Sequence, residues 1–72
     1  MTKHQQNVKT LAVAYHAYMV ALTADDDIGI SVYGKMLLDM QDKTGIVLLS
    51  ASGLRASIEY ADDRLVAARA AA

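Results

Sequence analysis

The sequence predicts an all-α protein, a small three-helix bundle that we expect to be oligomeric. Three stretches carry apolar residues at spacings of three and four, short turns separate them, and proline is absent. The hydrophobic share is 54% in a chain of 72 residues. Because so short a chain buries only about 60% of its unfolded surface, one copy is expected to leave apolar area exposed. Residues 1–72 are therefore predicted to form a single helical domain whose exposed apolar area is covered by another copy or by a partner protein.

The first helix is predicted over residues 4–24. Its centre, Leu11 to Leu22, contains His16 as the only conventionally polar residue. The segment is rich in alanine and lacks glycine, which favours a helix over a strand. Thr2 and Gln5 have the spacing of a capping box at its start. A helix that is apolar nearly all round is usually buried, so we expect it to lie between the other two helices or between subunits.

The second helix is predicted over residues 28–44. Asp25, Asp26 and Asp27 end the apolar run, and aspartate at a helix start accepts hydrogen bonds from free backbone amides. An apolar stripe follows, formed by Ile30, Tyr33, Leu37 and Met40. Gly45 stands where a left-handed residue would end the helix. Gly34, which weakens the helix interior, is expected to allow close approach of a neighbouring helix.

The third helix is predicted over residues 51–70, with Ser50 or Ser52 as its N-cap. Its heptad-like seam consists of Leu54, Ile58, Ala61, Leu65, Ala68 and Ala72. The preceding stretch, Ile46 to Leu49, is interpreted as a buried turn. The alternative fold is a minimal α+β protein, in which a βαβ unit spans residues 28–49 and this stretch forms a strand.

No pattern indicates an enzyme, a cofactor or a metal site. Cysteine is absent, and no nucleophile has a base at a diagnostic spacing. His4 and His16 would stand about 18 Å apart along one helix, so they cannot share a metal ion. The three aspartates do not form a calcium-binding loop either, because Gly29 and Met36 occupy positions where such a loop needs oxygen ligands.

The leading functional hypothesis is a non-enzymatic protein-binding module. It would act as a homodimer or higher homo-oligomer, or as a stoichiometric regulator or inhibitor of a larger protein, in the manner of small phage or mobile-element accessory factors. Methionine and tyrosine off the main stripes are favoured at protein interfaces. The predicted protein-binding residues are Tyr18, Val32, Met36 and Tyr60. Val20 and Leu65 are predicted to form the oligomer interface.

The alternative hypothesis is a helix-turn-helix-like DNA-binding or DNA-packaging adaptor, with Gly45 in the turn. Its recognition helix would offer Arg55 as the single cation for base contacts, followed by the acidic Glu59, Asp62 and Asp63. The net charge of −1 gives no general attraction for nucleic acid. The first apolar run, about 12 to 15 residues long, is shorter than the roughly 20 needed to span a bilayer, so we expect a cytoplasmic protein without a membrane partner.

Overall fold

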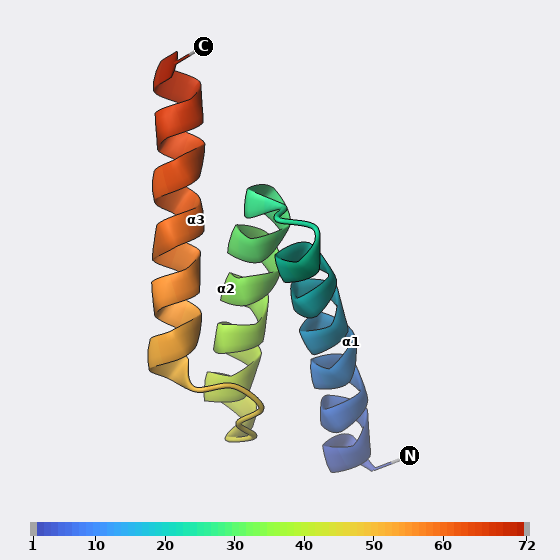
Figure 1. Cartoon of the computed structure of the whole chain (residues 1–72). Helices are drawn as coiled ribbons and strands as arrows, with labels where there is room; N and C mark the ends of the chain where they lie inside the picture. Colours follow the sequence, from blue (N-terminus) through green and yellow to red (C-terminus); the bar gives the residue numbers. More distant parts are fainter. Residues whose placement is uncertain (1, 72) are drawn as a thin grey trace.

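The computed structural model describes residues 2–71 and contains three α-helices (Figure 1). They are α1 (Lys3–Thr23), α2 (Asp27–Thr44) and α3 (Ala51–Ala71). No strand occurs among the described residues, so the predicted three-helix fold is confirmed and the βαβ alternative is wrong. The molecule measures 48 × 20 × 15 Å, which is long and narrow for its size.

The central helix is α2, which packs against α1 on one side and α3 on the other (Figure 1). The backbones of α1 and α3 make no close approach to each other within residues 2–71. The expectation that the first helix would lie between the other two is therefore wrong. The buried residues of α1 lie on one stripe at spacings of three and four, formed by Leu11, Ala14, Tyr18 and Ala21. Tyr15 is partly buried against the same core. The other large apolar residues of α1 are exposed, namely Val8, Val13, Met19, Val20 and Leu22.

Small residues of α2 allow its two neighbours to approach closely. A Cβ atom added at Gly29 would lie 2.8 Å from Cβ of Ala21 on α1. One added at Gly34 would lie 2.8 Å from Cγ1 of Ile58 on α3. These distances are shorter than van der Waals contact, so the glycines are what allow both neighbours to pack so close. The expected role of Gly34 in close helix approach is confirmed.

The core contains one fully buried leucine from each helix: Leu11 of α1, Leu37 of α2 and Leu54 of α3. Burying a leucine side chain contributes about 1.5–3 kcal/mol, so these three residues are a large part of what holds the helices together. Tyr18 and Ala61 belong to the same core. Among the described residues the core therefore joins all three helices in one cluster.

The helix ends are formed by the local signals that the sequence predicts. The Thr2 hydroxyl accepts a hydrogen bond from the Gln5 amide at 3.2 Å, and the Gln5 side chain accepts one from the Thr2 amide at 2.9 Å. The Asp26 carboxylate accepts from the Gly29 amide at 3.1 Å at the start of α2. Gly45 ends α2 with a φ of 73°, in the left-handed region. All of these caps satisfy backbone groups that a helix leaves free at its ends.

The loop between α2 and α3 is held by the side chain of Gln41. Its Oε1 accepts hydrogen bonds from the amides of Leu48 and Leu49 at 2.9 and 3.0 Å. Its Nε2 donates to the Leu49 carbonyl at 2.8 Å. Ile46 and Leu49 pack against the core, whereas Val47 and Leu48 are exposed, so the predicted turn is only half buried. The loop enters α3 at Ser50, whose hydroxyl accepts from the Gly53 amide at 3.1 Å.

The last turns of α3 extend beyond the rest of the molecule (Figure 1). The seam is buried at Leu54, Ile58 and Ala61, half buried at Leu65 and exposed at Ala68. We call residues 66–71 the α3 extension. The extension continues past the end of the molecule at which α2 starts, so it has no neighbouring helix to pack against.

Candidate functional site

One uncovered apolar feature is a ridge on α2, formed by Ile28, Val32 and Met36. The three residues follow one another at intervals of four, so their side chains line up along one side of the helix. All three are exposed. Ile30 and Leu37, which are buried, face the opposite side, where α1 and α3 pack. We call these three residues the α2 ridge.

The residues predicted to bind protein do not form one surface. Val32 and Met36 lie on the α2 ridge, and Tyr60 lies on α3 with 65% of its surface exposed. The assignment of Tyr18 to a protein-binding surface does not fit the structure, because only 3% of its surface is accessible. Its ring lies against Gly34, where an added Cβ would be 3.3 Å from its Cε1 atom. The glycine leaves the space that the ring fills, and the sequence gives no direct sign of that pairing.

The two residues predicted to form an oligomer interface also lie apart. Val20 is exposed on α1, whereas Leu65 is half buried on α3. The backbones of α1 and α3 do not approach each other closely in the described chain, although side chains such as Leu22 and Leu54 line a common hollow between them. Val20 and Leu65 are not among the residues that line it. Val20 remains available to a partner, and Leu65 marks the end of the packed part of α3.

A cluster around Arg64 ties α3 to the turn between α1 and α2. Its guanidinium donates to both carboxylate oxygens of Asp25, each at 3.2 Å, and its Nε lies 3.2 Å from Oδ2 of Asp27. The hydrogen bonds and charge of Asp25 raise the pKa of Arg64 above its ordinary value. The guanidinium carbon also lies 5.6 Å from the centre of the Tyr60 ring, within cation–π range. The cluster fixes the turn and helps to orient Tyr60.

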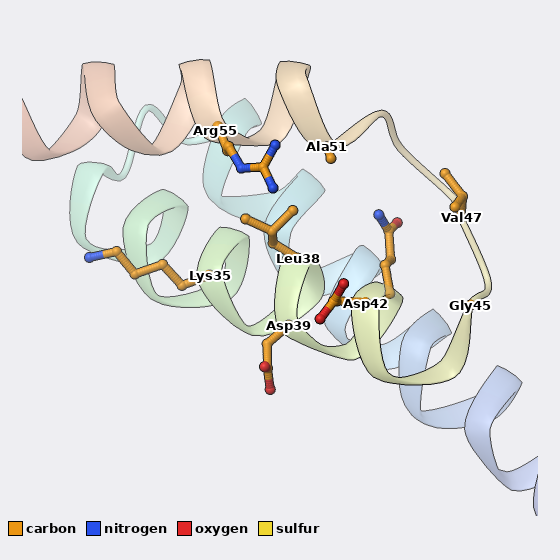
Figure 2. Close-up of a pocket in the computed structure, with 9 residues that line it drawn as sticks. Lys35, Leu38, Asp39, Asp42, Gly45, Val47, Ala51 and Arg55 are labelled. Carbon is orange, nitrogen blue, oxygen red and sulfur yellow. The ribbon is translucent and has the colours of Figure 1, made fainter.

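A shallow depression of about 600 Å³ lies between α2 and α3 (Figure 2). Figure 2 shows Leu38 between the two helices, with Arg55 of α3 and Asp42 of α2 on either side. Lys35 and Asp39 also line it, but Lys35 pairs with Asp62 at 3.2 Å and Asp39 with Lys43 at 2.9 Å. The lining contains two cations, Lys35 and Arg55, and two anions, Asp39 and Asp42, so the depression has no strong preference for an anion or a cation.

A second link between α2 and α3 involves Asp62. Its carboxylate accepts a hydrogen bond from the Ser31 hydroxyl and pairs with Lys35 at 3.2 Å. These hydrogen bonds hold the pKa of Asp62 below its ordinary value. Ser31 is one of the few buried polar residues, and Asp62 gives its hydroxyl a partner across the helix interface. The link therefore joins the buried face of α2 to α3.

The histidines are the natural candidates for proton transfer, and both are exposed on α1. Neither makes a hydrogen bond or ion pair through its side chain within residues 2–71. No group of three histidine or acidic residues in this part of the chain is placed to hold a metal ion. No helix within residues 2–71 has the length and apolar character needed to cross a membrane.

The arrangement of α2 and α3 differs from that of a helix-turn-helix. In that motif a turn of about three or four residues joins helices that cross at about 90–120°. Here the connection spans residues 45–50, and the two helices run in opposite directions side by side (Figure 1). Comparisons of the chain with protein-family models, with curated proteins and with solved structures give no match. The functional argument therefore depends on the exposed surface.

Proposed function

We propose that the chain is a non-enzymatic protein-binding module that uses the α2 ridge to dock onto another protein, as a stoichiometric regulator or as part of a homo-oligomer. The observation that carries the proposal is the exposure of Ile28, Val32 and Met36 along one side of the central helix. Isolated apolar residues on a surface are normal, but contiguous apolar surface is typical of interaction sites.

The total surface area supports the same proposal. The chain exposes 4976 Å², whereas a compact monomer of its mass, 7.7 kDa, is expected to expose about 4,300 Å². The excess is roughly 650 Å², close to the 800 Å² or so that each partner contributes to a standard protein interface. A partner of ordinary size would thus bring the exposed area near to the value for a compact protein.

The chemistry of the ridge suits a helix as the docking element. Side chains at intervals of four form a ridge that packs into the groove of another helix, with the axes crossing at about 50°. Lys35, Asp39 and Lys43 lie beside the ridge on the same exposed part of α2. An apolar centre with a charged rim is the usual composition of a protein interface. Met36 adds an adaptable side chain that fits varied partner surfaces.

The proposal is tested by placing charge on the ridge. The double variant Val32→Glu, Met36→Glu is compared with Val66→Glu, which changes an exposed valine of the α3 extension. Each is immobilised and exposed to an extract of the cells that produce the protein, and the retained proteins are identified and quantified. We expect the wild type and Val66→Glu to retain similar amounts of a partner protein. The ridge variant should retain at least tenfold less of it, since a buried unpaired charge costs several kcal/mol.

Two results would count against this function. One is equal retention by the ridge variant and the wild type. The other is retention that depends on nucleic acid and falls steeply with added salt, because release of counterions marks binding to phosphates rather than to apolar protein surface. Circular dichroism of each variant checks that the helices are intact. We expect them to be, because Val32, Met36 and Val66 are all exposed.

A further inference from the structure

The outer side of α1 carries a second apolar strip, separate from the α2 ridge. Val13 is 65% exposed and Val20 53%, although both lie in the middle of the most apolar segment of the chain. They are seven residues apart, which is close to two helical turns, so they lie on the same side of α1. His16, also exposed, stands between them on this side. α2 packs against the other side of α1, where Ala14 and Ala21 are buried.

Charge is distributed unevenly along the same helix. Between Lys3 and Thr23, α1 contains two lysines and no acidic residue. It ends at a turn that contains Asp25, Asp26 and Asp27. One end of the α1 surface is therefore basic and the other acidic. Arg64 neutralises part of the acidic end, but Asp26 has no ion pair among the described residues.

We propose that two copies of the chain associate through α1 in antiparallel orientation, with Val13 of each copy against Val20 of the other. This arrangement also places Lys9 of each copy one turn or less from the acidic turn, residues 25–27, of the second copy. The proposal goes beyond the proposed function, because it names the partner and uses a surface other than the α2 ridge.

The antiparallel orientation follows from charge. When two copies of α1 run in opposite directions, the basic start of each lies beside the acidic end of the other. In a parallel pair, Lys9 would lie beside Lys9 and the three aspartates beside the three aspartates, and such contacts between like charges cost several kcal/mol. The two-fold axis of the antiparallel pair passes close to His16 and Ala17, midway between the two valines.

The shape of the strip fits this register. A shallow hollow on α1 is lined by Gln6, Lys9, Thr10 and Val13. In the antiparallel pair, Val20, Thr23 and Ala24 of the second copy face this hollow. Thr23 keeps its hydroxyl on its own helix, where it donates to the Met19 carbonyl at 2.9 Å, so the facing surface has few free polar groups. The contact removes the exposed apolar area of Val13 and Val20 from water.

The first test measures mass by light scattering over a dilution series. We expect the wild type to approach twice the chain mass of 7.7 kDa at high concentration. Val13→Glu and Val20→Glu should each remain monomeric at concentrations at which the wild type is dimeric. Lys9→Glu should raise the dissociation constant roughly tenfold or more, because it places a fourth negative charge beside the three aspartates of the acidic turn. Lys43→Glu on α2 is the matched control and should leave dimerisation unchanged.

The second test determines the orientation and uses the absence of cysteine from the chain. The single variant His16→Cys lies near the proposed axis and should form a disulfide-linked dimer on mild oxidation. Val13→Cys alone and Val20→Cys alone should not, whereas an equal mixture of these two should link efficiently. Linkage by each single variant at the ends of the strip would indicate a parallel pair and overturn the proposal.

The remaining outcomes separate this inference from the proposed function. A strict monomer at all concentrations overturns the α1 dimer and leaves the α2 ridge to its own test. A dimer that is dissociated by Val32→Glu, Met36→Glu but not by Val13→Glu also overturns the α1 dimer, and it supports the ridge as the contact surface. Loss of binding to another protein in the ridge variant, with the dimer intact, supports both.

Discussion

Gln41 and Leu49, eight residues apart, are joined by two hydrogen bonds that run in opposite directions. The side-chain amide of Gln41 donates to the Leu49 carbonyl at 2.8 Å, and its oxygen accepts from the Leu49 amide at 3.0 Å. This is the pairing that a neighbouring strand would supply to an extended residue. The buried side chain of Gln41 thus satisfies the backbone amide and carbonyl of Leu49, as a neighbouring strand of a sheet would.

We predict that Gln41→Leu destabilises the protein by about 2–4 kcal/mol, because it removes three hydrogen bonds and leaves backbone groups of the loop without partners. Urea unfolding followed by circular dichroism measures the change. Asp42→Leu, at the neighbouring exposed position, is the control and should cost less than about 0.5 kcal/mol. Equal effects of the two substitutions would show that the hydrogen bonds of Gln41 are not important for stability.

Gly34→Ala is predicted to destabilise the protein by about 1–2 kcal/mol even though alanine is the better helix former. The new methyl group would lie 2.8 Å from Cγ1 of Ile58, so α3 must move away or Ile58 must change its rotamer. Thermal unfolding compared with the wild type provides the measurement. A rise in melting temperature would mean that the gap between α2 and α3 adjusts freely, contrary to the packing described above.

The link between Ser31 and Asp62 predicts a specific dependence of stability on pH. The pKa of Asp62 in the folded state is lowered by its hydrogen bonds to Ser31 and Lys35. A carboxylate with a lowered pKa stabilises the fold above its unfolded value, near pH 4, and this contribution disappears as the pH falls through the folded value. We therefore expect the wild type to lose more stability than Asp62→Asn between pH 6 and pH 3.

This expectation can be checked directly by NMR titration of the Asp62 carboxyl carbon. The midpoint should lie below the ordinary value for an aspartate, and Ser31→Ala should raise it. An unchanged midpoint in Ser31→Ala would mean that the hydroxyl does not stabilise the carboxylate. In that case the loss of stability of the wild type at low pH would have to come from other titrating groups.

Arg64→Met should loosen the turn between α1 and α2, because it removes the contacts with Asp25 and Asp27 while keeping much of the side-chain bulk. The expected loss is small, since exposed ion pairs contribute little, and it should be evident as a lower melting temperature at low ionic strength. In high salt the variant and the wild type should converge. Arg64→Lys should retain only part of the effect, because lysine cannot contact both aspartates with the same geometry.

Local signals explain why the helix boundaries could be predicted from the sequence. Each cap involves residues within three or four positions of one another, such as Thr2 with Gln5 and Asp26 with Gly29. The order of the helices could not be predicted in this way. Gly29 and Gly34 weaken α2 as an isolated helix, yet the same residues make it the helix that two neighbours can approach.

The candidate surface was predicted only in part for a related reason. Val32 and Met36 fall outside the buried stripe of α2 by spacing alone, and they are exposed as expected. Tyr18 is buried because a glycine on another helix makes room for its ring, a contact between residues 16 positions apart in the sequence. The sequence contains a weaker sign of the role of Gln41. Its spacing from Gly34 and Leu37 places it on the buried stripe of α2, and a buried polar side chain needs hydrogen-bond partners.

The α3 extension has a practical consequence for joining this protein to others. Residues 66–71 leave the body of the molecule as a helix with no neighbouring helix, so a polypeptide attached after them would begin beyond the packed part of the bundle. Alanine is the residue that helices tolerate best without packing, which keeps this segment straight rather than folded back. A fluorophore or an enzyme fused there would be held at the end of a short helical spacer.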